Sequence, residues 1–143
     1  MQFLPRVLAL ADRITAPSIV HAHCDLPCGV YDPAQARIEA ESVKGCMEKW
    51  AASDDPVFKE RAVFIKEQRA DMVKHHLWVL WTDYFKPEHL KKYPDLHELF
   101  WTATKLAGEA KHSVDPKKGQ QLLEAIEKID KIFWETKKAK KAA

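Results

Sequence analysis

The chain has few cysteines, no long apolar run and little net charge, and so lacks the features that are typical of disulfide-rich, membrane and nucleic-acid-binding proteins. Its 143 residues include only three cysteines and four glycines, and 23 basic and 21 acidic residues leave a net charge of +2. Three cysteines are too few for a disulfide-rich secreted domain, so we expect a cytoplasmic protein. The small net charge predicts neither a nucleic-acid nor a membrane partner. The longest apolar runs, such as Leu77–Trp81, stop at five residues, far below the roughly 20 that cross a bilayer.

The first 22 residues differ from the rest of the chain. They carry a basic residue and an apolar run at Val7–Ala11, and their ending loosely fits a signal-peptidase site. Asp12 and Arg13 stop the apolar run at five residues, whereas a secretory signal needs roughly 7 to 15. We therefore interpret residues 1–22 as a pro-segment that is removed on maturation. The rest is long enough for one domain with a hydrophobic core.

Start signals and periodicity predict four helices. Sustained strand-like alternation is absent from the sequence, and apolar residues recur at helical spacing. An aspartate before a proline favours a helix start, because the carboxylate caps the first turn and proline presets φ. Such starts occur at Asp32-Pro33, Asp55-Pro56 and Asp115-Pro116, with a related one at Tyr93-Pro94-Asp95. We expect helices near 33–51, 56–84, 94–111 and 116–139, packed within residues 32–143 as an all-α, antiparallel up-down four-helix bundle.

The second expected helix is too apolar to be buried by its own bundle alone. The five consecutive apolar residues Leu77–Trp81 point in every direction around a helix axis, so some must face outward. The chain also has five tryptophans, and large aromatic residues are enriched where proteins meet. These features predict a homo-oligomer. The alternative is a single bundle that tolerates one or two exposed rings.

A short segment before the first helix has the donors of a metal site. The run His23-Cys24-Asp25-Leu26-Pro27-Cys28 places an imidazole and two thiols within six residues. Thiolates are soft donors that bind late transition metals firmly. If His23 became the amino terminus, its α-amine, the Cys24 amide and both sulfurs could surround nickel(II) or copper(II) in a plane, with the imidazole on the axis. Cleavage after Ala22 would then create the site, which gives the pro-segment a chemical purpose.

The same segment resembles a known family. The run His23–Tyr31, followed by Asp32–Arg37, resembles the nickel-containing superoxide dismutases, and the similarity continues through Ile65–Arg69, Lys74–His76, Asp83–Pro87 and Ile129–Lys138. The resemblance implies a superoxide dismutase with one nickel ion per subunit, held in a hook of residues 23–31. Cycling between nickel(II) and nickel(III) would convert superoxide to dioxygen and hydrogen peroxide. It also implies a homohexamer of four-helix bundles and cleavage before His23 by a dedicated peptidase.

Individual roles carry over with this resemblance. It implies that His23, Cys24 and Cys28 hold the metal, with His23 giving both its amine and its axial imidazole. Glu39 would accept a hydrogen bond from that imidazole and be held in turn by Arg69, a chain that fixes a ligand's orientation. Apart from the resemblance, Glu39 and Arg69 are more simply interpreted as a structural ion pair.

Three further residues complete the implied site. Tyr31 and Tyr84 would line the small approach to the metal with hydroxyl groups, and Asp25 would steady the loop. The Leu26-Pro27 bond is expected to be cis. Tyrosine hydroxyls, ordered water and a cysteine thiol are all candidate proton donors, and the sequence does not choose among them.

Other conspicuous residues have plainer interpretations. Cys46 shares an apolar helix face with Val43 and Trp50, so we expect it in the core. The lysines from Lys137 to Lys141 suit a solvated helix C-terminus. His75 and His76 are neighbours on a helix, roughly 100° apart, and cannot face one ion. Two other functions stay open: a nickel or copper carrier or sensor without turnover, and a structural helical oligomer whose cysteines are incidental.

Overall fold

The computed structural model describes residues 29–142, with side chains as far as Lys138. This part of the chain is helical and contains no strand. The elements are α2 (Ala34–Ala52), α3 (Pro56–Val79), the π-helical turn η1 (Leu80–Tyr84), α4 (Pro87–Lys92), α5 (Leu96–Lys111) and α6 (Pro116–Ala142). The all-α class is therefore confirmed. The expected pro-segment, its cleavage point and the first six residues of the hook lie outside the described range.

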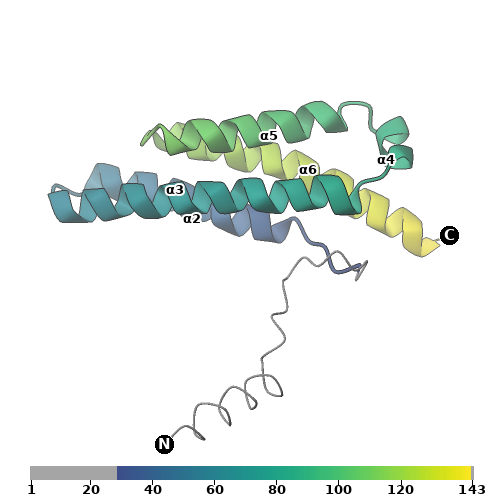
Figure 1. The fold of residues 1–143 in the computed structure, drawn as a ribbon, viewed down its shortest axis with the longest axis horizontal. Helices are drawn as coiled ribbons and strands as arrows, with labels where there is room; N and C mark the ends of the chain where they lie inside the picture. Colours follow the sequence, from purple (N-terminus) through teal and green to yellow (C-terminus); the bar gives the residue numbers. More distant parts are fainter. Residues whose placement is uncertain (1–28, 143) are drawn as a thin grey trace, which may run out of the picture.

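The four long helices form an antiparallel bundle. Helix α2 packs against α3 and α6, and α5 packs against the same two helices, so each helix has two neighbours (Figure 1). Because the helices alternate in direction, the start of α2, the end of α3 with η1, and the end of α6 all lie at one end of the bundle (Figure 1). Segments that are far apart in the sequence are thereby brought together next to the residues that follow the hook.

The expected helix starts are present. The carboxylates of Asp55 and Asp115 each accept a hydrogen bond of 3.0 Å from the amide two residues later, and the Asp32 carboxylate accepts one of 2.8 Å from Ala34. Each of the three aspartates thus satisfies an amide that the first turn leaves without a helical partner. Helix α5 begins at Leu96, two residues later than expected. There the Leu96 amide donates to the Tyr93 carbonyl at 3.0 Å, which closes a separate turn first.

The second helix does not end as a regular α-helix. Its last five residues form the π-helical turn η1, closed by a 3.0 Å hydrogen bond from the Phe85 amide to the Leu80 carbonyl. The wider turn lets Leu80 and Phe85, five residues apart, both be buried, at 2% and 8% exposure. It also carries Tyr84 to the end of the bundle. π-Turns of this kind occur often at functional sites.

Helix α4 was not predicted. Its six residues are too few to show a periodic pattern, although Pro87 at its first turn is a start signal of the kind recognised elsewhere in the chain. The Lys86 amide donates to the His89 imidazole Nδ1 at 3.1 Å, which caps this short helix. α4 therefore projects His89 toward the same end of the bundle as Tyr84.

The apolar residues that recur at helical spacing in the last expected helix form part of the core. Leu122, Ile126, Ile129 and Phe133 of α6 are at most 1% exposed. The expectation for Cys46 was only partly right, because its thiol is half-buried and lines a groove between α2 and α3 instead of the core. Burial still raises the pKa of the Cys46 thiol, against smaller opposing effects from nearby Lys49, Arg69 and Lys66. The group is therefore a neutral thiol at physiological pH.

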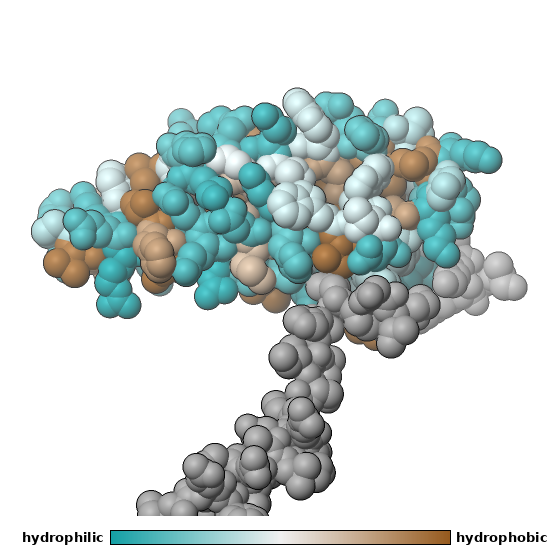
Figure 2. All heavy atoms as spheres, in the orientation of Figure 1, coloured by the Kyte–Doolittle hydropathy of each residue, from teal (hydrophilic) through white to brown (hydrophobic). Residues whose placement is uncertain are grey.

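The surface is mainly hydrophilic, with scattered apolar side chains on the face seen in Figure 2. As the run Leu77–Trp81 predicted, one of its residues points outward: Trp78 is 54% exposed, and Trp101 of α5 is 56% exposed beside it, where both line a shallow aromatic groove. Among the described residues, none of the helices is apolar over a stretch long enough to cross a bilayer.

Candidate functional site

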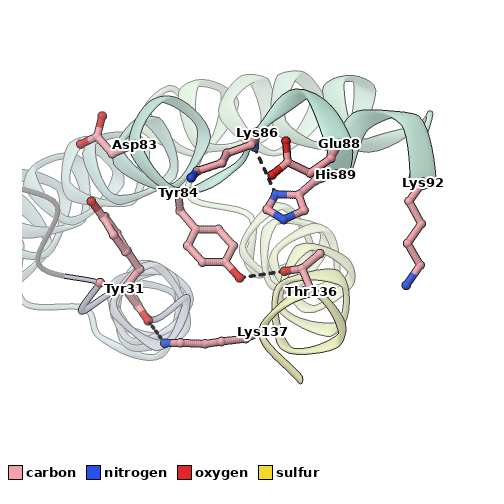
Figure 3. A pocket seen from close by; sticks show the side chains of 10 residues that line it. Tyr31, Asp83, Tyr84, Lys86, Glu88, His89, Lys92, Thr136 and Lys137 are labelled. Atoms are coloured by element: carbon pink, nitrogen blue, oxygen red, sulfur yellow. Dashed lines mark hydrogen bonds between the residues drawn. The ribbon is translucent and has the colours of Figure 1, made fainter. Parts of the chain in front are cut away.

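A pocket of about 560 Å³ opens at the end of the bundle where four segments meet. Its wall is formed by the residues just before α2, the end of η1, helix α4 and the last turns of α6 (Figure 3). The lining residues are Gly29, Tyr31, Asp83, Tyr84, Lys86, Glu88, His89, Lys92, Thr136 and Lys137. Gly29 directly follows Cys28, so the hook joins the described chain at this pocket.

The two tyrosines expected at the site do meet in this pocket. Tyr31 precedes α2 and Tyr84 ends η1, and their ring centroids lie 5.7 Å apart at a tilt of 55°. Tyr31 is buried, at 9% exposure, and Tyr84 is half-buried. Phe133 of α6 packs 4.4 Å from the Tyr84 ring and supports it from the core side. The structure therefore places both rings together, as the resemblance implies.

Residues from α4 and α6 hold Tyr84 from two further directions. The His89 imidazole stacks on its ring, with centroids 5.7 Å apart and an angle of 18° between planes. The Tyr84 hydroxyl lies 2.8 Å from the Thr136 hydroxyl, which is itself buried (Figure 3). Neither His89 nor Thr136 was singled out from the sequence. Thr136 lies within the closing segment of the resemblance, which is the signal that could have found it, whereas His89 lies outside every segment quoted for it.

Lys137 anchors the other tyrosine. Its Nζ donates a 2.9 Å hydrogen bond to the backbone carbonyl of Tyr31 (Figure 3). The same Nζ lies 4.9 Å from the centroid of the Phe133 ring. The expectation that Lys137 belongs to a solvated tail is therefore wrong, because packing of α6 beside the start of α2 gives its ammonium group an acceptor. Lys138, in contrast, is exposed as expected.

Glu39 and Arg69 form the expected pair between α2 and α3. The shortest distance between an Arg69 nitrogen and a Glu39 carboxylate oxygen is 3.2 Å. The Glu39 side chain is 15% exposed and that of Arg69 is 46% exposed, so the carboxylate is the more sheltered partner. Neither residue lines the tyrosine pocket; Arg69 borders the groove that contains Cys46. Within the described part of the chain, this pair and the tyrosine pair are thus two separate features.

The expected metal ligands His23, Cys24 and Cys28, together with Asp25 and the Leu26-Pro27 bond, lie outside the described residues. Among the residues that are described, no group of three or more His, Cys, Asp or Glu side chains could hold a metal ion. Gly29 has φ +71°, a left-handed conformation that glycine adopts without strain. Gly29 and Tyr31, both in the last part of the hook, line the pocket.

Comparison with known proteins agrees with this arrangement. The family model for nickel-containing superoxide dismutase matches residues 18–137. Nickel superoxide dismutases from Streptomyces coelicolor and Streptomyces seoulensis are 62% and 63% identical over 131 residues, which cover 91% of this chain and 100% of each relative.

Solved structures give the same result. A native nickel superoxide dismutase aligns with a TM-score of 0.80 and 65% identity, and one with oxidised-state nickel ligation aligns with 0.79 and 66%; both cover 81% of this chain and 99% of their own. The family match over residues 18–137 includes every residue that lines the pocket. The chain belongs to the nickel-containing superoxide dismutase family.

Proposed function

We propose that this protein converts two superoxide ions and two protons to dioxygen and hydrogen peroxide at a nickel centre. The observation that carries the proposal is the place where the hook joins the bundle. The residue after Cys28 lines a pocket walled by Tyr31 and Tyr84, in a chain that matches the nickel family over most of its length. A nickel ion, when bound, supplies one-electron oxidation and reduction between its +2 and +3 states.

Residues His23, Cys24 and Cys28 would hold the ion, one per subunit. The His23 amine and imidazole, the Cys24 amide and the two thiolates would supply nitrogen and sulfur donors of the kind that suits nickel. The position also supports this assignment, because Gly29, the residue after the last sulfur donor, lines the pocket. Asp25 would steady the loop between the two cysteines.

The described residues would orient the site and restrict access to it. Tyr31 and Tyr84 narrow the approach with two rings and two hydroxyls. The Arg69 guanidinium holds the Glu39 carboxylate, which would then accept from the His23 imidazole and fix its orientation.

Charge at the pocket favours an anionic substrate. Lysines 86, 92 and 137 line it, against the carboxylates of Asp83 and Glu88. These side chains give the lining an excess of one positive charge, and an excess of one sign in a cleft attracts ions of the other sign. Superoxide is a small anion and would be drawn toward the tyrosines.

Maturation would remove residues 1–22 and expose the His23 amine. The solved relatives align over 99% of their length with 81% of this chain, whereas the two Streptomyces proteins align over all of theirs with 91%. The solved chains are therefore shorter, as removal of a leader by a peptidase would make them. We place the mature enzyme in the cytoplasm as a homohexamer, and the exposed Trp78 and Trp101 are suitable contact residues between subunits.

The decisive experiment compares three single cysteine variants of the processed, nickel-loaded protein. Cys24→Ser and Cys28→Ser each remove a thiolate donor, so we expect both to lose nickel and dismutase activity while keeping their helical circular dichroism spectrum. Cys46→Ser is the matched control, because Cys46 lies in a different groove, and it should keep both. The measurements are nickel per subunit by elemental analysis and superoxide decay by pulse radiolysis.

A second arm tests the free amine. A chain that carries one extra alanine before His23 leaves every side chain in place but moves the α-amine away, so it should lose activity. Full activity in this variant, or in either of the first two cysteine variants, would contradict the ligand assignment. Tight nickel binding without superoxide decay in the processed wild-type protein would instead indicate a carrier.

A further inference from the structure

The hydroxyl of Tyr84 is connected to the last helix through Thr136. The two oxygens are 2.8 Å apart, and Thr136 is only 5% exposed. This distance alone allows either hydroxyl to be the donor. The direction matters, because a phenol that donates away from a pocket presents only its oxygen lone pairs to whatever enters.

A second hydrogen bond decides the direction. The Thr136 hydroxyl donates to the Phe133 carbonyl oxygen at 2.7 Å. A threonine hydroxyl carries a single proton, and a carbonyl oxygen can only accept. Since that proton is used for Phe133, Thr136 accepts from Tyr84, and the phenolic proton points at α6. The opposite arrangement would leave two acceptor oxygens 2.7 Å apart without a proton between them.

The surrounding rings fix the position of the Tyr84 ring, so its hydroxyl stays beside Thr136. His89 stacks on one side of its ring and Phe133 packs at 4.4 Å. The backbone amide of Lys86 holds the His89 imidazole in place through Nδ1. With the ring fixed, only rotation of the O–H bond about the C–O bond remains, and the hydrogen bond to Thr136 fixes that rotation.

We infer that Thr136 is a positioning residue that keeps the Tyr84 hydroxyl an acceptor toward the pocket. Tyr84 then does not donate a hydrogen bond to an anion there. It presents lone pairs to a protonated species, such as water or a protonated product, and so favours release of an anionic ligand. The effect on release of an anionic ligand during turnover rests on the proposed function. The direction of the hydrogen bond between Tyr84 and Thr136 does not rest on it.

The test uses three variants of the processed, nickel-loaded protein. Thr136→Val keeps the shape of the side chain and removes the acceptor, whereas Thr136→Ser keeps the hydroxyl. Tyr84→Phe removes the phenolic oxygen and provides the reference spectrum for subtraction. Ultraviolet resonance Raman then reads Tyr84 directly, because the intensity ratio of the tyrosine doublet depends on whether the phenol donates or accepts. We expect a donor signature in the wild type and in Thr136→Ser, and its loss in Thr136→Val.

Azide binding measured by calorimetry is the second readout. In Thr136→Val the freed proton can turn toward the pocket, so azide affinity should rise by about three- to tenfold, the effect of one hydrogen bond. Thr136→Ser should match the wild type, and azide affinity should not fall in Tyr84→Phe, because that variant removes oxygen lone pairs and no hydrogen-bond donor from the pocket. General damage to the site would weaken binding in Thr136→Val instead of strengthening it.

Three results would overturn the inference. They are an unchanged Raman signature in Thr136→Val, an azide affinity there that is equal or weaker, and a clear loss of azide affinity in Tyr84→Phe. The azide measurement on Tyr84→Phe needs no change at Thr136, so it still tests the inference if Thr136→Val folds poorly. The Raman signature is independent of turnover, so an enzyme without dismutase activity would refute the proposed function while leaving this inference testable.

Discussion

Replacing the buried Lys66 with methionine should be among the most damaging single changes outside the pocket. Lys66 of α3 is 2% exposed, and its ammonium group donates three hydrogen bonds, of 2.8, 2.6 and 2.8 Å, to the carbonyls of Ala110, Lys111 and Ser113. These carbonyls lie at and just beyond the C-terminal end of α5, where helical acceptors lack partners and a positive charge is favourable. The Lys66 side chain of α3 thus caps the C-terminal end of the neighbouring helix α5.

The magnitude follows from opposing contributions. Hydrogen bonds from a charged donor contribute about 1.5–3 kcal/mol each, while dehydrating an ammonium group costs several kcal/mol. Methionine has a similar length and removes that cost, but it leaves three carbonyls without their donor. We expect Lys66→Met to lower the free energy of unfolding by about 2–4 kcal/mol, which corresponds to a Tm lower by roughly 10 °C for a chain of this size.

The assay is urea unfolding followed by circular dichroism, at one protein concentration because oligomer stability depends on concentration. Lys128→Met is the matched control: Lys128 is exposed on α6, and its replacement should change stability by less than about 0.5 kcal/mol. A loss in Lys66→Met no larger than that of the control would refute the reasoning, because it would mean that water satisfies the three carbonyls equally well.

The same residue predicts a pH dependence. Burial lowers the pKa of Lys66 below its ordinary value of 10.5, against smaller opposing effects from Glu67 and Cys46. Between the lowered folded pKa and 10.5 the unfolded chain binds more protons, so the free energy of unfolding contributed by this group rises with pH. The stability difference between wild type and Lys66→Met should therefore widen on going from neutral pH toward pH 10.5. A difference that narrows over this range would show that the folded pKa is not lowered.

Two other changes test close contacts between helices. A Cβ at Gly119 of α6 would lie 2.9 Å from the Lys44 Cα and 2.8 Å from its Cβ, so Gly119→Ala should force α2 and α6 apart and destabilise the protein by about 1–3 kcal/mol. A Cβ at Gly45 would have no atom within 4 Å, so Gly45→Ala should instead stabilise the protein by about 0.5–1 kcal/mol. Equal effects of the two variants in thermal unfolding would contradict the close contact at Gly119. Lys137→Met removes the donor to the Tyr31 carbonyl, so we expect a lower dismutase rate with unchanged helical content, and an unchanged rate would show that the anchor has no role.

Much of the fold could be predicted because its signals are local. The Asp-Pro pairs each act within one helical turn, and all three aspartates accept a hydrogen bond from an amide at the start of their helix. The apolar stripe from Leu122 to Phe133 is likewise a property of one helix and became its buried face. The π-turn η1 escaped prediction because its advantage is tertiary: it buries Leu80 and Phe85 together against other helices.

The pocket, like the fold, has features that the sequence predicts and features that depend on tertiary packing. The sequence by itself determined the two tyrosines and the helix boundaries that bring their rings to one end of the bundle, and it predicts the metal donors of the hook. Only the tertiary structure decided that Thr136 and Lys137 hold those tyrosines, since Lys137 and Tyr31 are 106 residues apart in the chain. A side chain's own sequence neighbourhood sets its helix and its face, whereas its hydrogen-bond partner depends on which helix packs beside it.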